Sequence, residues 1–271
     1  MKQADVGQDE IHRWLKAAGL KAKTEGFIIT AQDQSLPTRW YQHNIVKKLD
    51  MDPKCRLCGH FNKTVDHLVS GCPELAKTEY IHCHYKVAPH VHWKICKEFG
   101  TKVKERWYEH EPMTITRKDS ITILWDMFIH TDRTIPANQP DIVLKNKKGK
   151  TCLLIDTTIP LETNISVNTM EKLNKYKNLE IKVERMWGLK TTTVPVVMGA
   201  LSTIKKDMEN YTNKIPGNIN IHELQKITFL STAHLLRRVL SIKKKPSLPP
   251  KTMVWTWMLR EKIIRNLTII S

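Results

Sequence analysis

The stretch PDIVLKNKKGKTCLLID, residues 140–156, decides the fold class of this chain. Its two apolar runs, IVL and CLLID, have the length of short strands, and the polar segment around Gly149 between them is typical of a hairpin turn. We therefore predict an antiparallel hairpin. One aspartate lies near each outer end of it, Asp141 before the first strand and Asp156 at the end of the second.

The segments around this hairpin follow helical and strand patterns in turn. Upstream, residues 123–129 (ILWDMFI) form an extended apolar segment. Downstream, residues 168–187 place apolar side chains at three- and four-residue steps, which predicts an amphipathic helix, and 194–200 (VPVVMGA) predicts a buried strand. A second amphipathic helix is expected over 222–240. The order strand, strand, helix, strand, helix predicts an α/β or α+β domain in which helices flank a mixed sheet.

A second informative region, further upstream, has the spacing of a metal-binding module. Cys55 and Cys58 have two residues between them. His67 follows after eight more residues, and Cys72 after a further four. Three cysteines and a histidine make a closed, tetrahedral ligand set for structural zinc, and Gly59 suits the tight turn that such a pair of cysteines needs. Because the protein fills every ligand position, the predicted zinc supports folding and leaves no place for a reactive water.

Two alternatives stay open for this cluster. The four side chains could be ordinary buried thiols beside an incidental histidine, or a neighbouring side chain could replace one of them. The substitutes are His60, His82, Cys83 and His84. Three further histidines are expected on a solvated basic face: His90, His92 and His110. Since the remaining cysteines lack partners at ligand spacing, the sequence predicts one zinc ion.

Composition indicates the class of partner and of compartment. Lysine plus arginine number 44 against 27 aspartates and glutamates, a net charge of +17, which attracts polyanions and favours a nucleic-acid or acidic-membrane partner. No segment approaches the roughly 18 uninterrupted apolar residues of a membrane span, and the first ten residues have no apolar signal core. We expect a soluble intracellular protein, nuclear or cytoplasmic and not secreted, that does not enter a membrane.

The two aspartates of the hairpin form a candidate catalytic site. Carboxylates on adjacent strands can converge on one divalent cation, and Mg²⁺ prefers such oxygen ligands. A cation held there can activate water and stabilise the charge that develops on a phosphodiester. Lys172, Lys175 and Tyr176 share one face of the following helix, toward the sheet. On the motif alone, solvated caps at strand ends are the more common role for residues such as Asp141 and Asp156.

These segments together resemble a known family. The runs CRLCG, TVDHLVSGCPELAKTEYIH, LWDMFIHTDRTI, QPDIV, LLIDTTIP, EKLNKYKNLEI and VPVVMGAL are similar to the carboxy-terminal part of non-LTR retrotransposon polyproteins of the restriction-like-endonuclease type. The resemblance covers roughly residues 20–240. In that family a reverse transcriptase precedes a CCHC zinc knuckle and a PD-(D/E)xK endonuclease. The resemblance implies zinc ligands at Cys55, Cys58, His67 and Cys72, and Mg²⁺ or Mn²⁺ ligands at Asp141 and Asp156.

The chain departs from the family pattern at the catalytic lysine. The position two residues after Asp156 is Thr158, so the D-x-K form of the motif is broken. The resemblance then implies a lysine that has moved to the next helix, with Lys175 as first choice and Lys172 as second. Arg133 resembles the basic residue that precedes the family's PD, with a surface salt bridge as the alternative role. The candidates for substrate binding are Arg133 and Tyr176.

The resemblance also suggests a division of the chain and a function. A polar segment around Pro112 is expected to join the two modules. The expected regions are a helical connector (1–54), a CCHC zinc knuckle with its flanking helix (55–110), a restriction-like endonuclease domain (121–241) and a basic tail outside the family pattern (242–271). A YxDD motif is missing, so we expect no polymerase activity and interpret the chain as a truncated copy or a derived host gene.

We expect a metal-dependent endonuclease that nicks DNA. It would bind DNA, with RNA as an alternative ligand of the knuckle, and no small-molecule organic cofactor is expected. The alternative is a noncatalytic, zinc-dependent nucleic-acid-binding remnant or domesticated protein. Intact Asp141 and Asp156 favour the enzyme, whereas the missing polymerase and the changed tail favour the remnant.

Overall fold

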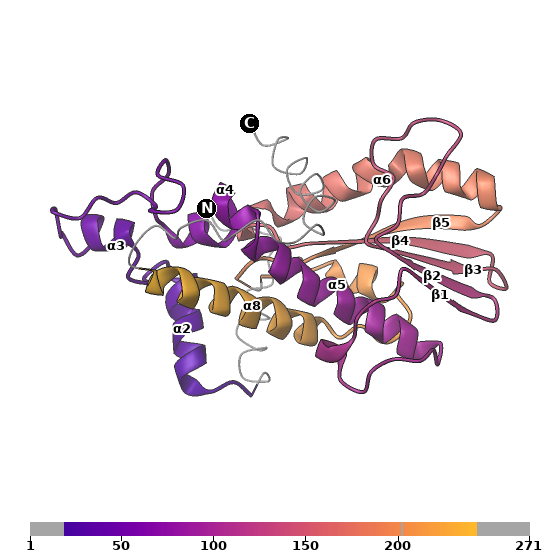
Figure 1. Cartoon of the computed structure of the whole chain (residues 1–271), viewed down its shortest axis with the longest axis horizontal. Coiled ribbons are helices and arrows are strands. Elements are labelled where there is room, and N and C mark those ends of the chain that lie inside the picture. The colour runs from indigo at the N-terminus through magenta and orange to yellow at the C-terminus, as the bar shows by residue number, and fades with distance from the viewer. Residues whose placement is uncertain (1–18, 202, 243–271) are drawn as a thin grey trace, which may run out of the picture. The chain divides into compact units, whose positions relative to one another are not determined.

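The computed structural model describes residues 19–201 and 203–242 of the chain (Figure 1). Two of the predicted regions extend beyond these residues. The first 18 residues of the helical connector, and the basic tail from residue 243 onward, lie outside the described part. In the part that is described, every helix is too short or too polar to cross a lipid bilayer.

The described residues fall into two compact units. Residues 84–228 form the larger one, here called the sheet unit, and residues 19–83 with 229–242 form the smaller unit. The division falls inside two long helices, α5 (Glu79–Glu98) and α8 (Ile221–Ser241), each of which contributes residues to both units.

The sheet unit is built on a five-stranded mixed sheet whose strands lie in the order of the sequence. The strands are β1 (Ile115–Lys118), β2 (Ile121–Trp125), β3 (Ile142–Asn146), β4 (Thr151–Thr158) and β5 (Lys190–Val197). Each of the first four strands is antiparallel to its neighbour, and β4 pairs with β5 in parallel. Parallel neighbours need a crossover connection, and helix α6 (Ile165–Trp187) supplies it. The mixed sheet with flanking helices confirms the predicted fold class.

The predicted hairpin is present as β3 and β4. Its turn is closed by the Asn146 side chain, whose Oδ1 accepts a hydrogen bond from the Gly149 N–H at 2.8 Å. The helix predicted over 168–187 begins three residues earlier and ends at Gly188, which adopts the left-handed conformation (φ 62°) that terminates many helices. These elements were predictable because their patterns are local.

Side chains pack on both faces of this sheet. On one face, Ile142 and Ile155 join a cluster with residues of α5, such as Val91, and of the first turns of α8. On the other face, Val143 and Leu154 pack against α6. Successive residues of a strand point to opposite faces, which is why β3 and β4 serve both clusters. The sheet unit is therefore a three-layer sandwich, with α5 and α6 on opposite sides of the sheet (Figure 1).

Strand β1 lies in the polar segment that the sequence suggested as a joint between modules. It pairs with β2 alone, and most of its residues are exposed. An exposed, charged edge strand of four residues has no apolar alternation, so its sequence gives no strand signal. The sheet unit also contains short helical segments: η2 (Trp107–Glu109), η3 (Glu162–Asn164) and α7 (Met208–Thr212).

The smaller unit consists of short helices and turns. Besides the ends of α5 and α8, its elements are α2 (Ala22–Gln32), α3 (Arg39–Asn44), the π-helical turn η1 (His67–Gly71) and α4 (Pro73–Ala76). Lys63 Nζ, buried, donates a hydrogen bond to the Val239 carbonyl at 3.2 Å, and Arg238 forms an ion pair with Glu79 at 2.7 Å. These polar contacts connect segments that are far apart in the sequence.

Candidate functional site

The four residues with zinc-ligand spacing come together in the smaller unit. The ligand atoms of Cys55, Cys58, His67 and Cys72 lie within 4.8 Å of one another. Three of these side chains are buried and Cys58 is partly exposed. This CCHC cluster could hold a metal ion such as zinc, as its spacing predicts. None of the four proposed substitutes belongs to it.

The turn between the first two cysteines has the tight geometry expected at Gly59. The Cys55 N–H donates to the Phe61 carbonyl at 2.7 Å, and the Gly59 N–H donates to the Cys55 carbonyl at 2.8 Å. Gly59 has a φ of 75°, a left-handed conformation that strains other residues. The turn folds back on itself, so the two sulfurs lie on the same side.

The second half of the cluster is positioned by the π-helical turn η1. His67 is its first residue and Cys72 follows directly after its last. A π-turn is wider than an α-turn and contains one more residue. Two residues that are five apart, such as His67 and Cys72, therefore lie on the same side of a π-turn. The hydroxyl of Tyr80 accepts the Cys72 N–H at 2.9 Å and lies 3.2 Å from the carbonyls of His67 and Leu68. Tyr80 therefore fixes the backbone at both ligands.

The thiols of Cys55 and Cys72 in the CCHC cluster differ in pKa. The thiol of Cys72 hydrogen-bonds to the sulfur of Cys55, and this contact lowers the pKa of Cys55 well below that of a free cysteine, with a further contribution from His67. The same contact, with burial, raises the pKa of Cys72. Cys55 is thus the first of the pair to become a thiolate, the form that binds metal.

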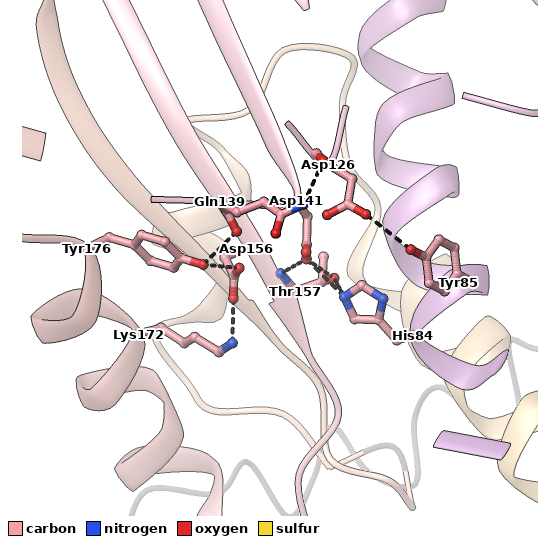
Figure 2. A network of polar contacts seen from close by, with 9 residues as sticks. All are labelled: His84, Tyr85, Asp126, Gln139, Asp141, Asp156, Thr157, Lys172 and Tyr176. Carbon is pink, nitrogen blue, oxygen red and sulfur yellow. Dashed lines mark hydrogen bonds and ion pairs between the residues drawn. The ribbon is translucent and has the colours of Figure 1, made fainter. Parts of the chain in front are cut away.

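The carboxylate site, Asp141 and Asp156, lies in the sheet unit at one end of the β3–β4 hairpin (Figure 2). Ile142 and Ile155 are the last pair of the β3–β4 ladder, and the two aspartates are the residues that directly adjoin this pair. They are almost completely buried, with 2 % and 1 % of their surface exposed. Buried carboxylates are costly unless they have charged or hydrogen-bonding partners. The reading of these residues as solvated strand caps is therefore wrong.

One carboxylate oxygen of Asp141 has several hydrogen-bonding partners (Figure 2). Its Oδ2 accepts hydrogen bonds from the Thr157 N–H at 2.7 Å and from the Thr157 hydroxyl at 2.6 Å. His84, on α5, places Nε2 3.0 Å from the same oxygen and 2.8 Å from the Thr157 hydroxyl oxygen. Since the Thr157 hydroxyl donates its hydrogen to Asp141, Nε2 of His84 is the donor in the remaining contacts.

Asp156 is held by two residues of α6. The Tyr176 hydroxyl donates to Asp156 Oδ1 at 2.7 Å and also lies 3.1 Å from the Gln139 carbonyl. Lys172 Nζ lies 2.5 Å from Asp156 Oδ2 as an ion pair, although that oxygen has no aligned hydrogen bond. Burial, and next the charge of Asp156, raise the pKa of Tyr176, so it stays a hydrogen-bond donor.

The carboxylate site fits a divalent cation in part. Asp156 Oδ2 is a buried oxygen with unused acceptor capacity. The Asp141 carboxylate contacts His84 of α5, whereas the Asp156 carboxylate contacts Lys172 of α6, so the two carboxylates have partners on different faces of the sheet. Among the described residues, however, no group of three ligands within 4.8 Å includes Asp141 or Asp156. Mg²⁺ commonly uses one or two carboxylates and completes its shell with water and phosphate oxygens, so these residues can hold it only together with such ligands.

The other predicted site residues lie further from the carboxylates. Lys175 contacts the ring of Tyr176, with Nζ 4.9 Å from the ring centroid. Arg133 is exposed on the segment between β2 and β3, where its carbonyl accepts a hydrogen bond from the Thr131 hydroxyl. Of the two candidate lysines, Lys172 is the one in contact with Asp156.

Among the side chains that contact the two carboxylates, the sequence does not point to His84 or Thr157. The spacing suggests His84 only as a substitute zinc ligand. A usable signal was its position on α5, since His84, Val87 and Val91 follow the helical period, and both valines are buried against the sheet. Thr157 gave no signal apart from its place beside Asp156.

The expectation that His90 and His92 face solvent is wrong. His90 is 2 % exposed and His92 is fully buried, while His110 is half-buried. The rings of Trp107 and Trp125 stand edge-on to His90 and His92, respectively. The segment after α5 covers this face of the helix, which the periodicity of the helix alone does not reveal.

Comparison of the chain with protein-family models and with curated proteins found no match. We therefore infer the function from the geometry and charge of the CCHC cluster and of the carboxylate site.

Proposed function

We propose that this chain is a metal-dependent DNA endonuclease of the PD-(D/E)xK type with a zinc-stabilised nucleic-acid-binding module, related to the carboxy-terminal part of non-LTR retrotransposon polyproteins. One observation carries the proposal. Two buried aspartates adjoin the last residue pair of a β-hairpin, and a buried lysine of the next helix contacts one of them. Such a group of buried ionisable residues is more typical of a functional site than of a stabilising core.

Each residue of the carboxylate site has a role in this proposal. A bound Mg²⁺ or Mn²⁺ would polarise the phosphate and activate the attacking water. Asp141 and Asp156 would hold the cation, and Tyr176 and Thr157 keep the two carboxylates oriented through their hydrogen bonds. Lys172 would balance the negative charge that builds up on the phosphate in the transition state.

The charge of the chain supports a nucleic-acid substrate. A net charge of +17 attracts the phosphate backbone without regard to sequence. The CCHC cluster would stabilise the smaller unit as a binding module for DNA, with RNA as the alternative. Arg133, exposed on the segment that leads to Asp141, remains a candidate for phosphate contact.

A plasmid-nicking assay tests the proposal. We expect the full chain to convert supercoiled DNA to the open-circular form with Mg²⁺ or Mn²⁺, and a chelator to stop it. Asp141→Asn and Asp156→Asn should abolish nicking while DNA binding persists. Asp119→Asn is a matched control, since Asp119 is an exposed carboxylate in the turn before β2. Nicking that survives both substitutions at the carboxylate site would refute the assignment.

The second candidate is a noncatalytic nucleic-acid-binding remnant. It is favoured by the way the chain itself satisfies the carboxylate site, because Lys172 neutralises Asp156 and one oxygen of Asp141 has three close donors. Folded protein that contains zinc and binds DNA, but does not nick it with either metal, would support this candidate.

A further inference from the structure

A second group of metal-ligating side chains lies in the sheet unit, apart from the carboxylate site. His92 and Cys96 are four residues apart on α5 and therefore lie on one face of that helix. His110 follows η2 in the segment that leads to β1. The ligand atoms of these three residues lie within 4.8 Å of one another. They are here called the HCH cluster.

The distances in the HCH cluster come near those of a tetrahedral ion site, and small side-chain movements would complete it. Zn–N bonds of about 2.1 Å and a Zn–S bond of about 2.3 Å at tetrahedral angles separate nitrogen from sulfur by about 3.6 Å, and two nitrogens by about 3.4 Å. The Cys96 sulfur lies 3.6 Å from His92 Nδ1 and 3.8 Å from His92 Nε2, so it lies over the ring, and a rotation of the Cys96 or His92 side chain would bring it to an ion bound at Nδ1. His92 Nδ1 lies 2.9 Å from His110 Nε2, so a small opening of this pair would admit an ion.

The surroundings favour ligands that are ready to bind. His92 and Cys96 have 0 % and 1 % of their surface exposed, and a buried side chain has few alternative rotamers. The ring nitrogens His92 Nδ1 and His110 Nε2 face each other at 2.9 Å. A contact of this length needs one hydrogen between the two rings, and an ion can take the place of that hydrogen.

We propose that His92, Cys96 and His110 bind a second zinc ion, with water as the fourth ligand. Two imidazoles and one thiolate form a borderline-soft set that suits zinc. The ion would clamp the segment between α5 and β1 onto α5, because His110 is its ligand from that segment. This inference goes beyond the proposed nuclease and does not depend on it.

The test is the zinc content of the purified full chain and of four variants. We expect two zinc ions per folded wild-type chain, and one in Cys96→Ser and in His110→Ala. Cys58→Ser should lose the ion of the CCHC cluster and keep the other. His130→Ala is the matched control for His110→Ala, because His130 is exposed and lies outside both clusters.

Cobalt substitution gives a second readout. Thiolate-to-cobalt absorption should fall by about a quarter in Cys96→Ser, since that variant removes one of four metal-bound thiolates. One zinc ion in the folded wild type, unchanged by Cys96→Ser and His110→Ala, would overturn the proposal. Occupancy by copper and not by zinc would overturn the choice of metal. If Cys96→Ser fails to fold, the wild-type content and His110→Ala still decide.

Discussion

Replacing Lys172 by methionine should destabilise the sheet unit strongly. The side chains of Lys172 and Asp156 are 8 % and 1 % exposed, so the substitution leaves a buried carboxylate without its cation. Loss of one partner of such a pair costs about 3 to 5 kcal/mol. The Tyr176 hydroxyl still donates to Asp156, which favours the lower end, or about 3 kcal/mol. That figure corresponds to a roughly hundredfold change in the folding equilibrium.

Urea denaturation measures this effect. Of the described tryptophans, all but Trp40 lie in the sheet unit, so tryptophan fluorescence reports mainly on that unit. With an m-value of about 2 kcal/mol/M, the transition midpoint should fall by about 1.5 M. Lys175→Met is the matched control, because Lys175 is half-buried over the Tyr176 ring, and its loss should cost less than about 1 kcal/mol.

Two further measurements test whether the unpaired charge of Asp156 causes the loss of stability in Lys172→Met. The double variant Lys172→Met with Asp156→Asn removes both charges and should recover most of the lost stability. Mg²⁺ should stabilise Lys172→Met more than it stabilises the double variant, because a cation that binds only the folded state stabilises it by mass action. Equal midpoints for Lys172→Met and Lys175→Met, or no recovery in the double variant, would refute the reasoning.

Three other outcomes are expected. A strong chelator should unfold the smaller unit and leave the strands of the sheet unit folded, because zinc can supply on the order of 10 kcal/mol of folding free energy to such a module. Far-ultraviolet circular dichroism should then show a partial loss of ellipticity, and an unchanged spectrum would contradict this prediction. His84→Ala should reduce plasmid nicking more than His130→Ala does, because only His84 contacts Asp141; equal rates would remove His84 from the site. DNA affinity should fall with salt, with a slope of about −0.9 per neutralised phosphate, and a flat response would exclude electrostatic binding.

The parts of the fold that sequence predicts are those with local signals. The β3–β4 hairpin, α6 and the CCHC cluster follow from periodicity and from spacing within short stretches. The choice between Lys172 and Lys175 does not follow from periodicity or spacing. Both can face the sheet from the same helix, and which one reaches Asp156 depends on where α6 begins relative to β4.

The HCH cluster shows a different limit of prediction from sequence. Histidine is compatible with solvent, with a core and with a metal site, so its identity does not predict its burial. His92 is buried because residues distant from it, including Trp125, pack against its ring. Contacts between separate segments of chain decide such a case, and no periodicity records them.

The π-helical turn η1 limits which deletions and substitutions the chain can accept between His67 and Cys72. A π-turn is equivalent to an α-turn that has gained one residue, and such turns persist mainly where they serve a function. Removing one residue between His67 and Cys72 would restore α-helical geometry and rotate the cysteine by about 100° around the helix axis. The Tyr80 hydroxyl, which lies near two carbonyls of this turn, would lose its partners as well. We therefore expect a single-residue deletion in the four-residue interval before the last cysteine to disrupt the cluster, and a substitution at the partly exposed Ser70 to be tolerated.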